Sequence, residues 1–213
     1  MIYKNILRED QLKLLSNLKF LPKQSYMAGG TALALQLGHR TSLDFDFYSP
    51  QHLEIEKLIA DFQKEFGSVR VQRTAKDTII LEIDGVSFSL FYYPYKLISA
   101  PINFENVRLA RLEDIAAMKM IAISMRGKRR DFIDVYFLLK RFSLEKMINI
   151  TLKKYPSYQP MVILKGLIYF QDAELDDVSR KIEIFDKNFS WEAAKKKIFE
   201  EVKEYQLSML KKD

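Results

Sequence analysis

The segment GGTALALQLGHRTSLDFDF, residues 29–47, ends in two carboxylates one residue apart, Asp44 and Asp46. Side chains alternate along a strand, so residues i and i+2 share one face. Two neighbouring carboxylates repel each other unless a cation lies between them. Mg²⁺ prefers oxygen ligands and usually takes one or two carboxylates together with phosphate oxygens, and Mn²⁺ suits similar ligands. The pair is therefore a candidate Mg²⁺–nucleotide site, although a solvent-facing strand is the more common origin of Asp-x-Asp alone.

Two glycines open the same segment, Gly29 and Gly30, between a predicted strand at 25–28 and a predicted helix at 31–38. Glycine allows close backbone approach. The first amides of a helix, together with the helix dipole, favour an anion. We therefore expect the amides of Gly30 and Thr31 to form a phosphate cradle near the carboxylates. A tight strand-to-helix turn explains the glycines equally well and is compatible with that role.

The hydrophobic pattern of the whole chain predicts an α+β fold. The alternation of 42–49 places Leu43, Phe45 and Phe47 on one side of a strand and the carboxylates on the other. Further strands are predicted at 68–74, 78–83 and 86–93, and further helices at 9–20 and 52–66, followed by a loop at 94–107. Helices are then predicted at 112–126, 130–141, 144–155, 158–172 and 190–210. A mixed sheet with helices, 1–110, is thus followed by a helical bundle, 111–213.

The bulk composition excludes several classes of protein. The 213 residues are 48% hydrophobic and 29% charged, as in a folded domain rather than a disordered chain. The chain has no cysteine, which excludes disulfides, cysteine–zinc sites and cysteine nucleophiles. The N-terminus lacks the apolar stretch of a secretory signal, and no apolar run approaches the ~18 residues of a membrane span, so we expect a cytoplasmic protein. A net charge of +6 fits an anionic partner such as nucleic acid without requiring one.

The segment 29–47 resembles the glycine-pair and D-h-D signature of DNA-polymerase-β-type nucleotidyltransferases. Its GHR…S.D.D spelling is similar to that of the AbiEii/AbiGii toxin branch, the enzymatic half of type IV toxin–antitoxin and abortive-infection systems. A second block, LEDIAAMKMIAISMRGKRRDFIDVYFLL (112–139), resembles that branch in its lysine, its basic turn and its R-D-x-x-D. The resemblance covers roughly residues 25–140 and implies a nucleotidyltransferase core whose active site is completed by the helical domain.

The resemblance also implies roles for individual residues. Asp44 and Asp46 would hold the metal, Lys119 would contact the triphosphate, and Asp134 would be required for activity, positioning the acceptor or Lys119. The nucleotide- and phosphate-binding candidates are Gly29, Gly30, Thr31, His39, Arg40, Ser42, Arg126 and Arg130. An alternative for Lys119 and Asp134 is a salt bridge between two helices, and an alternative for His39 is loop packing.

The chain departs from the polymerase-β pattern at the third carboxylate. The corresponding strand, 86–93, offers only Ser87 and Ser89, while Glu82 lies on the neighbouring strand as a possible substitute. A site with a single Mg²⁺ therefore fits better than a two-metal mechanism.

The resemblance finally implies substrates and partners. It points to transfer of a nucleoside monophosphate from an NTP to an RNA, with tRNA as the leading acceptor, and to a DNA-binding antitoxin as partner. The alternatives are transfer to a small molecule or a protein hydroxyl, and a module that binds nucleotide or RNA without turnover.

Overall fold

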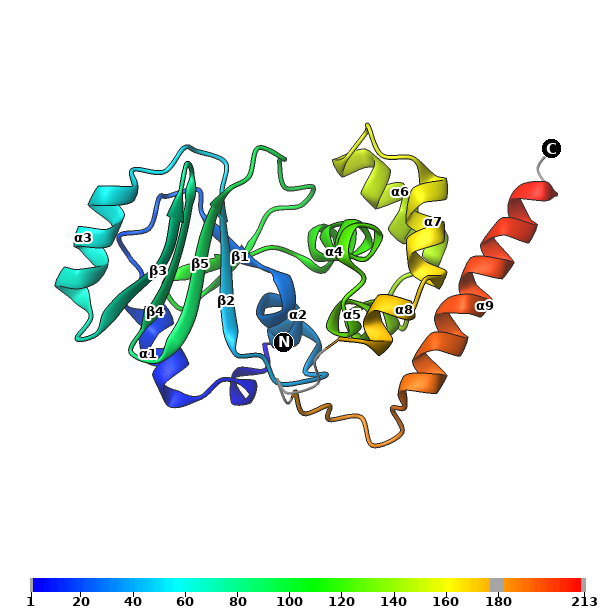
Figure 1. Ribbon diagram of the computed structural model, residues 1–213, viewed down its shortest axis with the longest axis horizontal. Helices are drawn as coiled ribbons and strands as arrows, with labels where there is room; N and C mark the ends of the chain where they lie inside the picture. The colour runs from blue at the N-terminus through cyan, green and yellow to red at the C-terminus, as the bar shows by residue number, and fades with distance from the viewer. Residues whose placement is uncertain (1, 177–181, 212–213) are drawn as a thin grey trace. The chain divides into compact units, whose positions relative to one another are not determined.

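The computed structural model describes residues 2–176 and 182–211. The chain divides into two compact units, Met1–Arg111 and Leu112–Asp213 (Figure 1). The first unit holds the sheet and the second is helical, so the α+β fold expected from the sequence is confirmed. No helix in the described ranges is long and apolar enough to span a membrane.

The first unit is built on a seven-stranded sheet with the order β3-β4-β5-β2-β1-β7-β6. Its strands are β1 (Tyr26–Ala28), β2 (Asp44–Ser49), β3 (Val69–Ala75), β4 (Thr78–Ile83), β5 (Val86–Tyr92), β6 (Ile102–Phe104) and β7 (Val107–Leu109). Its helices are α1 (Glu9–Ser16), α2 (Gly29–Leu37) and α3 (Ile55–Glu65), preceded by a short 3₁₀ turn, η1 (Lys4–Ile6). Strand β2 lies in the middle, antiparallel to β1 and parallel to β5.

One face of this sheet forms the core of the unit, and we call it the apolar face. Phe45 and Phe47 on β2 are 0% and 1% exposed, and Phe47 stacks on Phe88 of β5 with ring centroids 5.1 Å apart. Phe62 of α3 meets Phe88 edge-on at 4.9 Å, so α3 covers this face. The other side, which carries Asp44 and Asp46, we call the polar face.

The second unit is a bundle organised around its first helix. Its helices are α4 (Leu112–Arg126), α5 (Arg129–Leu138), α6 (Leu144–Lys154), α7 (Pro160–Ile168), α8 (Gln171–Glu174) and α9 (Trp191–Leu210). Helix α4 packs against α5, α6 and α7, while α9 runs along α5, α6 and α7 (Figure 1). The pair α4–α7 approaches so closely that a Cβ on Gly166 would lie 2.7 Å from the Cα of Ser124.

Several element boundaries differ from those expected from the sequence. The loop expected at 94–107 contains β6, and β7 begins at its last residue. Strands of three residues are too short for alternation to be visible. Their turn also carries Glu105 at φ 51° instead of the glycine that usually marks a hairpin. The helix expected at 158–172 is broken into α7 and α8, and the break brings Phe170 within 5.0 Å of the Phe132 ring.

Other differences concern helix and strand ends. Helix α1 stops at Ser16 rather than residue 20, and α2 starts at the first glycine rather than after the pair. Leu43 precedes β2 instead of continuing its apolar side, and it is 41% exposed. Gly38 is the C-cap of α2, with φ 62°.

The bundle contains an ion pair sealed from solvent. Lys154 Nζ of α6 lies 2.8 Å from Asp114 Oδ1 of α4, and both side chains are 0% exposed. Removing one partner of such a pair leaves a buried charge without compensation, whereas replacing both by apolar groups is often neutral.

We therefore predict that Asp114→Asn lowers the free energy of unfolding by about 3–5 kcal/mol, and that Asp114→Leu combined with Lys154→Met recovers most of the loss. Urea unfolding measures both. The control is Lys197→Met, which breaks the exposed pair with Glu201 on α9 and should cost under about 1 kcal/mol. Equal losses for the buried and exposed pairs would contradict the prediction.

Candidate functional site

Strand β2 places Asp44 and Asp46 together on the polar face of the sheet. Because Phe45, Phe47 and Ser49 are buried, the alternating residues Asp44 and Asp46 must point to the opposite side, where they are half-buried. The parallel register with β5 sets Asp44 beside Ser87 and Asp46 beside Ser89. The two carboxylates therefore share one face, as the alternation predicted, and serines are their neighbours on the next strand.

The start of α2 lies directly beside the second carboxylate. Ala28 at the end of β1 pairs with Asp46, and α2 begins at the next residue, Gly29. Gly29 has φ +70°, which lets the strand turn at once into the helix. A Cβ at this position would lie 2.9 Å from Asp46 Oδ2. Only glycine lets the helix N-terminus and this carboxylate come so close.

The second glycine makes room for an arginine. A Cβ on Gly30 would lie 2.5 Å from Nη2 of Arg40, so the guanidinium rests against the backbone of the first turn of α2. Arg40 is only 2% exposed, and its Nη1 donates to the carbonyl of Thr41 at 2.9 Å. His39, 4% exposed, precedes it. The segment after α2 thus adds a buried positive charge to the positive end of the helix dipole.

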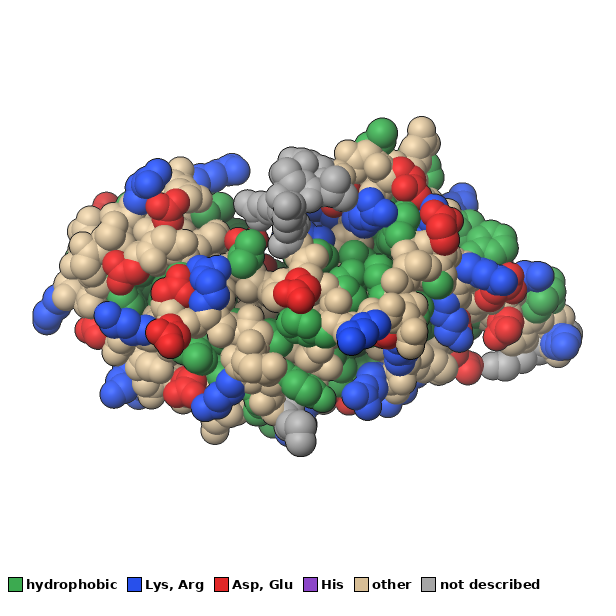
Figure 2. Space-filling model, turned by 90° about the horizontal axis from the view of Figure 1, so that it is seen from below, with side chains coloured by type: hydrophobic (Ala, Val, Ile, Leu, Met, Phe, Trp, Pro, Cys, Tyr) green, Lys and Arg blue, Asp and Glu red, His purple; other side chains and the backbone are tan. Residues whose placement is uncertain are grey.

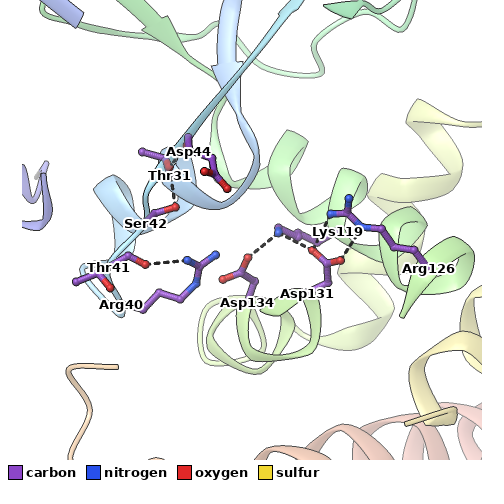
Figure 3. A network of polar contacts seen from close by, with 9 residues as sticks. All are labelled: Thr31, Arg40, Thr41, Ser42, Asp44, Lys119, Arg126, Asp131 and Asp134. Carbon is purple, nitrogen blue, oxygen red and sulfur yellow. Dashed lines mark hydrogen bonds and ion pairs between the residues drawn. The ribbon is translucent and has the colours of Figure 1, made fainter. Parts of the chain in front are cut away.

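Hydrogen bonds fix the first turn of α2 to the beginning of β2. The hydroxyls of Thr31 and Ser42 are hydrogen-bonded at 2.7 Å, and Thr31 also donates to the backbone carbonyl of Asp44 (Figure 3). The buried Gln11 of α1 donates to the carbonyls of Ser42 and Leu43 at 3.1 and 3.2 Å. The side chains of Thr31 and Ser42 therefore hold the frame of the site, and Gln11 is a positioning residue that local pattern could not reveal.

The donor set suits a divalent cation bound together with a substrate. Within residues 2–176 and 182–211, no group of three or more His, Asp or Glu side chains is placed to hold a metal. Asp44 and Asp46 supply the two carboxylates that Mg²⁺ usually takes from a protein when phosphate oxygens and water supply the rest. The absence of a Cβ on Gly29 lets the Asp46 carboxylate lie directly against the N-terminus of α2.

Glu82 is poorly placed to be the third carboxylate. It pairs with Ser87, which in turn pairs with Asp44, so it lies two strands away, at about 10 Å for ~4.8 Å per strand. Its Oε1 accepts from Arg70 Nη2 at 2.9 Å. This geometry disfavours a metal shared between Glu82 and the Asp44–Asp46 pair.

In the second unit, Lys119 lies between two carboxylates of α5. Its Nζ is 2.8 Å from Asp131 Oδ1 and 2.6 Å from Asp134 Oδ2, and all three side chains are 7% exposed or less. Arg126, at the end of α4, reaches Asp131 Oδ2 from the surface at 2.9 Å, with 57% of its side chain exposed (Figure 3). The salt bridge between α4 and α5, considered from the sequence as an alternative role for Lys119 and Asp134, is therefore present. It also includes Asp131, which that alternative did not name.

These charges also set the ionisation of Asp131. Burial raises the pKa of its carboxyl. The positive charges of Lys119 and Arg126 together lower the pKa by more than burial raises it, so the pKa of Asp131 lies below its usual value. Arg130 is half-buried in the first turn of α5. The signal for Asp131 in the sequence was its position three residues before Asp134, on the same face of the helix.

Comparisons with known proteins agree with this fold. JHP933 from Helicobacter pylori has a TM-score of 0.61 at 17% identity, over 100% of this chain and 96% of that one. MenT4, a nucleotidyltransferase toxin from Mycobacterium tuberculosis H37Rv, has a TM-score of 0.59 at 16% identity, over 91% of this chain and 82% of that one. At these identities the similarity establishes a common fold.

Similarity in sequence establishes the family. An uncharacterized protein of Aquifex aeolicus (strain VF5) is 36% identical over 185 residues, which cover 84% of this chain and 87% of that protein. The model of the family described as nucleotidyl transferase AbiEii toxin, type IV TA system, matches residues 13–206. The resemblance inferred from two sequence blocks is thereby confirmed, and the chain is a nucleotidyltransferase that belongs to the AbiEii toxin family of type IV toxin–antitoxin systems.

Proposed function

We propose that this enzyme transfers a nucleoside monophosphate from an NTP to an RNA, with tRNA as the leading acceptor, and releases pyrophosphate. The acceptor hydroxyl oxygen bonds to the α-phosphorus while the bond to pyrophosphate breaks, and the hydroxyl proton passes to water. The observation that carries the proposal is the contact between the start of α2 and Asp46, where only the absence of a Cβ leaves space. A helix N-terminus beside a carboxylate pair suits a metal-bound triphosphate.

Each candidate site residue of the first unit has a role in this proposal. Asp44 and Asp46 hold Mg²⁺, or Mn²⁺, which neutralises triphosphate charge when bound. The backbone amides of Gly30 and Thr31 donate to phosphate oxygens, and the buried Arg40 adds positive charge beside them. His39, Ser42 and Gly29 shape the same turn.

In the second unit, Lys119 neutralises charge on the departing pyrophosphate, and Asp134 orients its ammonium. Arg126 and Arg130 assist with phosphate. Asp131 has a positioning role in this scheme, because it contacts both Lys119 and Arg126. The cellular setting is the cytoplasm, where a DNA-binding antitoxin of the same system holds the toxin in check.

We predict that Asp44→Asn and Asp46→Asn each reduce label transfer from an α-³²P-labelled NTP to total RNA by about 100-fold or more, because each removes a charge from the metal site. The matched control is Asp61→Asn on α3, which covers the apolar face and should leave transfer unchanged. Melting curves check folding of all three.

Persisting transfer in both aspartate variants would remove the assignment of the site. Pyrophosphate release separates the alternatives. Release with label on a small molecule or a protein would exclude an RNA acceptor, and NTP binding without release would indicate a binding module. One observation supports the binding module: serines lie beside Asp44 and Asp46, where a third carboxylate would be expected.

A separate prediction concerns the charges around Lys119. A carboxyl whose pKa is lower in the folded chain than in the unfolded chain stabilises the fold above the unfolded value, and this contribution is lost as the pH falls through the folded value. The pKa of Asp131 is shifted in this direction. Asp131→Asn should therefore destabilise by about 3 kcal/mol at neutral pH, and its difference from wild type should shrink as the pH drops below about 4.

Urea unfolding at a series of pH values measures this difference. Asp172→Asn, at an exposed position of α8, is the control and should differ little from wild type at every pH. A deficit of Asp131→Asn that does not change with pH would show that Asp131 acts by packing and not by charge.

A further inference from the structure

We infer that the outer part of the polar face, on β3 and β4, binds the phosphate backbone of the acceptor RNA, with Arg73 as its principal phosphate contact. This inference rests on the proposed transfer to RNA and names the surface that would receive the acceptor.

The strand register connects β3 to the candidate site. Arg70 of β3 pairs with Glu82, Glu82 with Ser87, and Ser87 with Asp44. In the next row, Arg73 pairs with Ile80, Ile80 with Ser89, and Ser89 with Asp46. Residues paired across strands point to the same side of a sheet. Two parallel rows therefore each begin at an arginine on the edge strand and end at one of the two aspartates.

A bulge is what brings both arginines to the polar face. Residues three apart on a regular strand point to opposite faces, because the side-chain period is two. The pairing of β3 with β4 shifts between Val71 and Arg73, so that Gln72 is the extra residue and Arg73 returns to the side of Arg70. Without this shift, Arg73 would point to the apolar face.

The charges along this surface suit a polyanion. Arg73 is exposed, and β3 is the edge strand of the sheet. Arg70, with 72% of its side chain exposed, lies 2.9 Å from Glu82, and Gln72 donates to the same carboxylate at 3.3 Å. Arg70 thus neutralises Glu82, the acidic side chain in the row that ends at Asp44, and the row from Arg73 to Asp46 contains only Ile80 and Ser89.

The distance between the two arginines and the two aspartates is appropriate for an RNA strand whose end is held at the candidate site. Three strand spacings of ~4.8 Å separate the arginines from the aspartates, about 14 Å in all. This span corresponds to about four stacked nucleotides at ~3.4 Å each. On the face drawn in Figure 2, the coloured lysines and arginines are scattered among acidic side chains. The register of β3 with β4 is the observation that identifies the proposed surface.

The test measures binding of fluorescein-labelled, unfractionated tRNA by anisotropy at several salt concentrations. Arg73→Gln should weaken binding about tenfold and lower the slope of log affinity against log salt by about 0.7 to 0.9. Glu82→Gln should tighten binding about threefold, because it removes a negative charge and releases Arg70. The charge-matched control, Lys64→Gln on α3 at the other side of the sheet, should change neither quantity beyond a small general effect.

The outcomes separate this inference from the proposed function. No RNA binding by the wild type, or equal effects of Arg73→Gln and Lys64→Gln, overturns the RNA surface. A larger rise in KM for NTP than for RNA in Arg73→Gln overturns it too, since the arginine would then serve the nucleotide. If binding depends on Arg73 but the wild type labels no RNA, the surface stands and the proposed transfer to RNA fails.

Discussion

The site depends on the placement of two like charges side by side in the middle strand of a sheet. Phe45 and Phe47 are almost wholly buried, and they fix which side of β2 faces the core. A slip by one residue would move Asp44 and Asp46 into that core at a large electrostatic cost. The apolar residues of β2 thus determine the position of the polar ones. The geometry of the carboxylates is therefore as secure as the core packing beneath them.

The surrounding elements bring positive charge and dipoles to this pair instead of covering it. The start of α2 meets Asp46 at Gly29, and the guanidinium of Arg40 fills the place where a Cβ on Gly30 would be. Both contacts require glycine, and the two glycines have different reasons for being there. The first adopts a positive φ and leaves space beside a carboxylate, and the second leaves space for a buried cation. The pair that reads in sequence as one motif performs two separate steric functions.

The sequence predicted those features that depend on local pattern. The alternation of β2 and the bounds of α4 both follow from hydrophobic periodicity, and the structure confirms them. The features it missed depend on partners distant in the chain. Gln11 fixes a segment 31 residues away, and the bulge in β3 is defined only by its pairing with β4.

Two buried lysines among the described residues of the helical unit show why an ion pair alone does not identify a functional residue. Lys154 pairs with Asp114, and neither side chain has any exposed surface. Lys119 has two carboxylate partners, and its network continues through Asp131 to Arg126 at the surface.

A pair of opposite charges without exposed surface is adequately explained by helix packing, because neither side chain is in contact with solvent. The Lys119 network is different, since a group approaching Arg126 changes the charge balance of Asp131 and, through it, of the lysine. Buried ion pairs are costly to desolvate and contribute little net stability compared with apolar residues of similar size. The path to the surface through Arg126 therefore favours a functional interpretation for Lys119, and the sealed position of Lys154 favours a structural one.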